Sequence, residues 1–372
     1  MKLFPTKKED IYALLDQIDP ERYARTRNYV DGAVSYLSPY ISRGILSTRD
    51  VFEHLKKQNL VWTSVEKFVQ ELAWRDYFQG VWMRLGEAIN SDIKQPQFPV
   101  RSQNMPQSVF DCDTGIQGVD KGIRNLIETG YMHNHQRMYV ASLVCNVAQC
   151  HWQEAAKWMY FYLLDGDWAS NACSWQWVAG SFSNKKYYAN QENINRYCRT
   201  DQVNTYLDFS YEDLPQIDIP GQLVKTRELN FVTNLPQTDD DFCIQSDLPV
   251  LIYNWYNLDF EWYKNENVNR VLLLEPDVFK RHPISNQSVK FMMDLAKNIP
   301  EIKIFQGSFK ELKLKLESPE FIFKEHPLNH YEGSSESRRF LAQPTNKKFN
   351  SFFGFWKSIE KQLKSEFEET MA

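Results

Sequence analysis

The chain has 372 residues, a formal net charge of −5 and an aromatic content of 15%. This length is sufficient for two domains with hydrophobic cores of their own. Neither half of the chain, divided near residue 219, is basic, which excludes a protein that binds nucleic acid through its overall field. DNA binding would therefore need a local basic patch.

The N-terminus and the cysteines bear on the compartment. The segment MKLFPTKKEDIY lacks the apolar core of a signal peptide, and no run of about 18 apolar residues is present. The six cysteines form no C-x-x-C pair and show no zinc spacing, so we expect free thiols and no metal cluster. These features favour a cytoplasmic protein without a membrane partner. We also expect a monomer.

Residues 1 to about 210 are predicted to be almost wholly helical. Apolar residues recur at three- and four-residue steps over 63–89, and two strongly apolar helices are predicted over 137–149 and 153–164. Gly130 is expected to end a helix shortly before a new one begins near Asn134.

Beyond residue 210 the pattern changes. Turn residues and charges gather in a predicted linker over 216–247. PVLIYNWY, RVLLLEP and IKIFQG are then typical of buried strands, and NQSVKFMMDLAKNI and FKELKLKLE of helices between strands. This order predicts a parallel sheet, followed by a last amphipathic helix over 351–369. We therefore divide the chain into a helical domain (1–215), the linker (216–247) and an α/β domain with a C-terminal helix (248–372).

The segment DGDWASNACSWQW (165–177) is the most informative part of the chain. It could be a surface turn, because Asp and Gly are common in turns. Trp175 and Trp177 argue against that interpretation, since large indole rings are normally buried. If Asp165 and Asp167 are buried, each needs a cation or a strong hydrogen-bond donor.

Three upstream segments supply partners of the right chemistry. In GYMHNHQRM (130–138), helical spacing places Asn134, Arg137 and Met138 on one face, so Arg137 could pair with Asp165. ELAWRDYF (71–78) carries a glutamate, a tryptophan and an arginine within two helical turns. SYLSPYISRGILS (35–47) offers serine hydroxyls before a helix, which suit a phosphate.

These four motifs, in this order, resemble the flavin-binding domain of the DNA photolyase and cryptochrome family over roughly residues 22–200. The resemblance implies a mainly α chain, in which an all-helical FAD-binding domain precedes a smaller α/β domain. Family members usually carry an α/β antenna domain before the flavin domain. The C-terminal α/β domain could thus be a relocated antenna-type domain or an unrelated module, and binding of an antenna chromophore stays open.

The resemblance also implies a set of FAD-binding residues. The segment from Ser35 matches the phosphate-binding segment of the family, although Val34 stands where the family commonly has Thr. Asp167 matches the acceptor for the flavin N3–H, and Asn171 the amide beside flavin N5. The implied cofactor-binding residues are Ser35, Leu37, Ser38, Arg75, Arg137, Asp165, Asp167 and Asn171.

A second set matches the pocket for a cyclobutane pyrimidine dimer. A dimer pairs and stacks poorly, so flipping it out costs less than flipping a normal base, and indole faces can then sandwich its rings. Glu71 would hydrogen-bond base edges, and asparagine at 134 favours cyclobutane dimers over (6-4) photoproducts. The implied substrate-binding residues are Glu71, Trp74, Asn134, Met138 and Trp177.

Trp175 and Trp152 match the inner two members of the family's photoreduction chain. The outer tryptophan has no counterpart, because residues 90–103 contain no Trp and Phe98 is far harder to oxidise. Nearby tyrosines or Trp158 could replace it. The implied catalytic residues are Glu71, Asn134, Trp152, Asn171 and Trp175.

The implied function is light-driven repair of cyclobutane pyrimidine dimers, with reduced FAD as cofactor and UV-damaged DNA as partner. This is the lyase activity of a deoxyribodipyrimidine photolyase, and Lys185 and Lys186 could belong to its basic rim. The alternatives are a cryptochrome-like blue-light sensor that binds FAD without repair, and a relic without photochemistry. The presence of every lesion-pocket residue favours repair.

Overall fold

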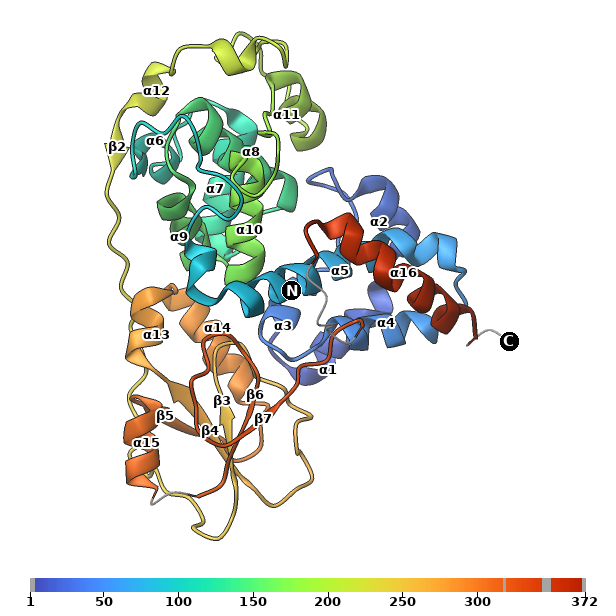
Figure 1. Ribbon diagram of the computed structural model, residues 1–372, viewed down its shortest axis with the longest axis vertical. Helices are drawn as coiled ribbons and strands as arrows, with labels where there is room; N and C mark the ends of the chain where they lie inside the picture. The colour runs from blue at the N-terminus through green and yellow to red at the C-terminus, as the bar shows by residue number, and fades with distance from the viewer. Residues whose placement is uncertain (1–3, 317–318, 343–348, 370–372) are drawn as a thin grey trace. The chain divides into compact units, whose positions relative to one another are not determined.

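The structure is a computed structural model that describes residues 4–316, 319–342 and 349–369 (Figure 1). The chain folds into two compact units, each built from segments that are distant in the sequence. We call residues 22–34 and 84–231 the helical unit, and residues 1–21, 35–83 and 232–372 the mixed unit.

Capping residues determine where the helices of the helical unit begin and end. Gly130 ends α7 in the left-handed conformation (φ 73°), as the sequence predicts, and a Cβ there would come within 2.5 Å of the Leu164 side chain. Asp167 caps the start of α10, and Gly180 ends it with φ 82°. All or most of the following elements belong to this unit: α2 (Pro20–Thr26), η2 (Gly86–Asn90), β1 (Met105–Pro106), α6 (Gln107–Phe110), α7 (Gln117–Thr129), α8 (Asn134–Ser142), the π-helix η3 (Leu143–Val147), α9 (Trp152–Tyr162), α10 (Trp168–Ala179), α11 (Gln191–Cys198), η4 (Leu214–Gln216), α12 (Gly221–Val224) and β2 (Thr226–Arg227).

The mixed unit joins helices from the start and the end of the chain to a parallel sheet. All or most of the following elements belong to it: α1 (Lys8–Ala13), η1 (Leu15–Gln17), α3 (Ser38–Ser42), α4 (Thr48–Lys56), α5 (Trp62–Leu85), β3 (Val250–Tyr253), β4 (Asn269–Leu274), α13 (Pro276–Arg281), α14 (Asn286–Ala296), β5 (Lys303–Gln306), α15 (Phe309–Lys315), β6 (Phe321–Lys324), β7 (Ser334–Glu336) and α16 (Phe352–Glu368).

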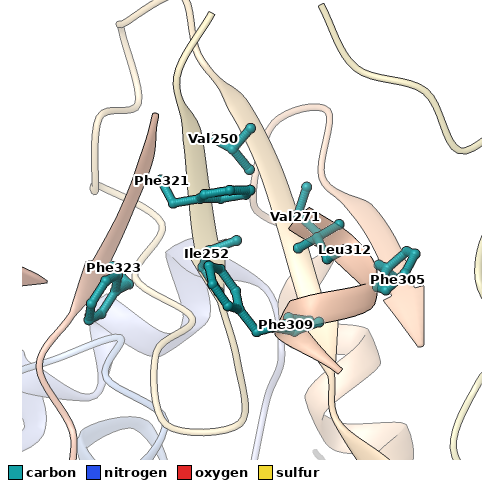
Figure 2. Packing of buried hydrophobic residues seen from close by; sticks show 9 residues of the cluster. Val250, Ile252, Val271, Phe305, Phe309, Leu312, Phe321 and Phe323 are labelled. Atoms are coloured by element: carbon teal, nitrogen blue, oxygen red, sulfur yellow. The ribbon is translucent and has the colours of Figure 1, made fainter. Parts of the chain in front are cut away.

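The sheet has the order β5-β4-β3-β6-β7, with every neighbouring pair parallel. Its central strands are buried along nearly their whole length, which explains their continuous apolar runs. Alternate residues such as Val250 and Ile252 of β3 point to one face, where Phe309 and Leu312 of α15 complete a buried cluster (Figure 2). The predicted helical domain and parallel sheet are both present.

The units differ from the division drawn from the sequence. Residues 35–83 belong with the C-terminal third because α16 packs on α4 and α5: the Phe367 ring lies 6.0 Å from Phe52 and 5.9 Å from Trp62. Part of the expected linker is also structured, since β2 pairs with β1. Helical periodicity shows that a helix has an apolar face but not which distant helix covers it.

Two further features concern partners. Within the part of the chain that the structure describes, no helix is long and apolar enough to cross a membrane. Among these same residues, no group of three or more His, Cys, Asp or Glu side chains could hold a metal ion. The six cysteines, all described, form no disulfide.

Candidate FAD and lesion site

The connection between α9 and α10 carries two buried carboxylates. Asp165 is 7% exposed and Asp167 is 3% exposed, so the segment is not a solvated turn. Nη2 of Arg137 donates to both oxygens of Asp165, at 3.0 and 2.9 Å, which confirms the predicted pair. Nε of Arg137 donates to the carbonyl of Met132 at 2.8 Å. The bond to the Met132 carbonyl fixes the Arg137 guanidinium in the orientation that the Asp165 carboxylate needs.

Asp167 begins α10 as its N-cap. Its Oδ2 accepts from the backbone N–H of Ser170 at 3.1 Å and from the Ser170 hydroxyl at 2.5 Å. These bonds and the positive end of the helix dipole stabilise the carboxylate where it is buried.

Asn171 lies one helical turn beyond Asp167 and is 8% exposed. Its Nδ2 donates to the carbonyl of Ala156 on α9 at 2.8 Å, which sets the orientation of the amide. An amide nitrogen carries two hydrogens, so the predicted donation to flavin N5 would use the second one.

The two tryptophans of the expected electron chain are both buried. Trp152 is 0% exposed and Trp175 is 2% exposed. The indole N–H of Trp152 donates to Oδ1 of Asp92 at 2.8 Å, a contact that the sequence did not predict. A carboxylate at this position stabilises positive charge on the ring. Trp158 lies edge-on to the half-exposed Tyr162, with 6.2 Å between centroids, whereas Phe98 is 80% exposed.

The predicted lesion residues of the helical unit are exposed or partly exposed. Asn134 is exposed, and its Nδ2 lies 4.0 Å from the sulfur of Met138, so the two share a helix face as predicted. Trp177 is 39% exposed, and its ring is tilted against that of Tyr187 at 6.0 Å. Lys185 is also exposed.

The remaining predicted cofactor residues lie in the mixed unit. The Ser35 hydroxyl accepts from the N–H of Leu37 at 3.4 Å, and Ser38 is the first residue of α3. Nη1 of Arg75 on α5 donates to the Ser42 hydroxyl at 2.8 Å. The structure thus joins the predicted phosphate segment and the predicted flavin-contacting arginine through Ser42.

Trp74 is covered on one face by the C-terminal helix. The Phe352 ring stacks on its indole, with 3.6 Å between centroids and 10° between planes, and Phe352 is 3% exposed. Glu71, one turn earlier on α5, pairs with Lys67 at 3.0 Å. Nothing in the sequence indicated the stacking, because periodicity does not show which residues of α16 meet α5.

Asp76 is a further buried carboxylate that was not predicted. Its oxygens accept from the Thr48 hydroxyl at 2.9 and 3.0 Å and from the N–H of Leu341 at 2.7 Å. Burial raises the pKa of Asp76 to about 7, although these bonds and the nearby Arg338 guanidinium act in the opposite direction. Asp76 ties α4 and α5 to the segment that precedes α16.

The chemistry of these side chains suits FAD. Its diphosphate requires hydroxyl and cationic donors, of the kind that Ser35, Ser38 and Arg75 provide in the mixed unit. Its ring requires a buried acceptor and an amide donor, of the kind that Asp167 and Asn171 provide in the helical unit. A buried carboxylate at a helix start, beside an oriented amide, fits a heterocycle edge that carries an N–H.

Comparisons with known proteins identify similar sequences over part of the chain. Residues 68–216 match the family model described as the FAD binding domain of DNA photolyase. The deoxyribodipyrimidine photo-lyase of Agrobacterium fabrum is 32% identical over 207 residues, which are 48% of this chain and 42% of that protein. Cryptochrome DASH of Danio rerio is 31% identical over 169 residues, which are 42% of this chain and 32% of that protein.

The chain also aligns with a crystal structure of a Synechocystis sp. cryptochrome at 27% identity and a TM-score of 0.48, covering 52% of this chain and 44% of the other. It spans less than half the length of each of these three proteins. The matched region contains most of α5 and the buried polar set at the start of α10. Residues 68–216 are therefore similar to the FAD-binding domain of the DNA photolyase and cryptochrome family.

Proposed function

We propose that this protein repairs cyclobutane pyrimidine dimers in DNA under blue light. The observation that carries the proposal is the buried set at the start of α10, in which Asp165 is paired with Arg137 and Asp167 is held as a helix cap. The same unit leaves Asn134 and Trp177 open to solvent. This combination supports a bound cofactor and an accessible substrate surface.

Two sets of side chains would bind the cofactor. Ser35, Leu37 and Ser38 would contact the phosphates, and Arg75 the flavin. Asp167 would accept from the ring N–H, while Asn171 would donate its second amide hydrogen near N5. When bound and reduced, FAD supplies the electron that opens the dimer on excitation.

The substrate would be held by different side chains. Trp177 offers an exposed indole face on which a flipped-out dimer can stack, and Asn134 offers an amide for a base edge. Glu71 would hydrogen-bond the dimer. By sharing a proton with the dimer, it would stabilise the negative charge that follows electron transfer. Trp175 and Trp152 would carry electrons inward from the surface, with Asp92 favouring the positive charge on Trp152.

Purified protein tests this proposal through two properties. Its absorption spectrum should show bound flavin, and it should bind an oligonucleotide that contains one dimer more tightly than the same oligonucleotide without it. Flavin-loaded protein that shows no such preference would contradict repair. Protein that holds no flavin would contradict the assignment of the cofactor residues.

One observation favours a second candidate, a cryptochrome-like light sensor that binds FAD without repair. Phe352 already occupies one face of Trp74, a residue expected to stack on the dimer. Cryptochrome DASH proteins are also among the relatives of the matched region. Equal binding of damaged and undamaged DNA, together with light-dependent flavin reduction, would favour this candidate.

A further inference from the structure

The loop that follows β3, residues 254–258, packs against α3. The guanidinium of Arg43, directly after α3, lies 3.3 Å from the ring centroid of Trp255 and 5.3 Å from that of Tyr256. Arg43 is 0% exposed and Trp255 is 3% exposed. A stacked cation–π contact that is fully desolvated is among the stronger contacts of its kind.

The backbones of the two segments also meet. The N–H of Leu258 donates to the carbonyl of Arg43 at 2.7 Å. Gly44 has φ +68°, and a Cβ at this position would lie 2.7 Å from the carbonyl oxygen of Tyr256. Only glycine permits so close an approach in this conformation. The path of the chain after α3 is therefore fixed by the 254–258 loop.

The 254–258 loop is itself anchored to the sheet. Nδ2 of Asn254 donates to Oδ1 of Asn329, which follows β6, at 2.9 Å. Oδ1 of Asn254 accepts from the N–H of Tyr256 at 3.0 Å, and the Tyr256 ring stacks on His326 at 4.1 Å. The sheet order changes direction between β3 and β6, and in open α/β sheets ligands bind beyond the carboxyl ends of the strands at such a point. Here the loops at this end hold α3.

A second contact joins α3 to a helix of the α/β region. The ring of Tyr40, in the middle of α3, lies 6.2 Å from that of Phe291 on α14, and Tyr40 is 0% exposed. Its hydroxyl donates to the carbonyl of Pro5 at 2.8 Å. Contacts at the centre and at the end of α3 thus hold this short helix in place. They thereby also fix the position of Ser38, its first residue.

We propose that Trp255 is a positioning residue for the cofactor. By holding Arg43, it fixes the orientation of α3 and so places the segment Ser35–Ser38 for the FAD diphosphate. The inference rests on the proposed function in one respect, the assignment of Ser35–Ser38 to the phosphates.

The test compares matched variants of the full chain. Trp255→Leu removes the aromatic face, Trp255→Phe keeps one, and Trp262→Leu removes a tryptophan that is 5% exposed and bonds to Glu336 instead. The dissociation constants of FAD and of riboflavin, which lacks phosphates, are measured by flavin fluorescence, with thermal unfolding alongside.

Trp255→Leu should weaken FAD binding about tenfold, which corresponds to the loss of a desolvated cation–π contact. Riboflavin binding should not change, Trp255→Phe should restore most of the FAD affinity, and Trp262→Leu should lower only the unfolding temperature. Arg43→Lys should also weaken FAD binding, and its effect should not add to that of Trp255→Leu because both variants break one contact.

Unchanged FAD affinity in Trp255→Leu, or equal losses for FAD and riboflavin, would overturn the inference. The underlying assignment is tested separately by Ser38→Ala. If wild-type protein binds FAD but Ser38→Ala binds it equally well, the phosphate assignment fails, and the inference fails with it. Wild-type protein that does not bind FAD at all would contradict the proposed function itself.

Discussion

The two units treat their predicted site residues in opposite ways. In the helical unit, Asp165 and Asp167 are buried and bonded, while Trp177 and Asn134 remain accessible. In the mixed unit, Trp74 on α5 is stacked under Phe352 at the start of α16. The helical unit therefore leaves two predicted lesion residues accessible, whereas the mixed unit uses another predicted lesion residue for packing.

The two units differ in which part of the chain supplies the side chains that contact their predicted site residues. The partners of the helical-unit residues come from the matched region, which contains both Arg137 and Asp165. Phe352, which covers Trp74 in the mixed unit, comes from the C-terminal third, outside residues 68–216. The motif around Trp74 thus indicates its chemistry, but Phe352, from outside the matched region, covers one face of the Trp74 ring.

The largest expected effect concerns the covering of Trp74. Phe352→Ala should lower the free energy of unfolding by about 3–5 kcal/mol, because it leaves a cavity against the indole. Urea unfolding measures this change. Phe353→Ala is the matched control: Phe353 is 60% exposed, so its loss should change stability by no more than about 0.5 kcal/mol. Similar effects of the two variants would mean that the stacking does not stabilise the unit.

The ion pair of the helical unit should contribute somewhat less. Arg137→Ala deprives the buried Asp165 of this cation and should cost about 3 kcal/mol. The control is Arg199→Ala, which breaks an exposed pair with Asp31 and should cost less than about 1 kcal/mol. Equal losses in urea unfolding would contradict a structural role for the Arg137–Asp165 pair.

The pH dependence of the free energy of unfolding should reveal the raised pKa of Asp76 in the mixed unit. Its folded-state pKa of about 7 lies above the ordinary value of 3.8, so the folded protein retains a proton that the unfolded chain loses. The resulting stabilisation is complete below about pH 4 and is lost as the pH rises toward 7. Relative to wild type, Asp76→Asn should gain stability over this range, by about 1.4 kcal/mol per unit of upward shift.

Asp294 provides a control of opposite sign. The side chains of Lys290 and Lys297 lower its pKa, so its stabilisation is present above about pH 4 and is lost as the pH falls. Asp294→Asn should therefore lose stability at neutral pH and approach wild type in acid. Parallel pH profiles for Asp76→Asn and wild type would show that Asp76 titrates normally.

The smallest expected effect concerns the open surface of the helical unit. Trp177→Ala should weaken binding to dimer-containing DNA about tenfold, as expected for the loss of one stacking contact. Binding to undamaged DNA should change little, because phosphate contacts carry no information about the lesion. Flavin absorption should persist. An equal loss for both DNAs would place Trp177 outside the lesion pocket.

The sequence predicted the local chemistry of the site better than its surroundings. The Arg137–Asp165 pair, the Asn134–Met138 face and the helix stop at Gly130 follow from spacing and residue type, and the structure confirms them. The parallel sheet also followed from its apolar runs. Contacts between distant segments, such as Trp74 with Phe352, depend on tertiary packing that spacing does not encode.

Light-driven repair tests the central claim most directly. Purified protein with reduced FAD is mixed with an oligonucleotide that contains one cyclobutane dimer, and intact dimer is measured after blue light and after darkness. We predict loss of the dimer only in the light. Trp175→Phe protein that has been chemically reduced beforehand should repair equally well, because the proposed role of Trp175 is confined to flavin reduction. Flavin-loaded, reduced wild-type protein that leaves the dimer intact in the light would contradict repair.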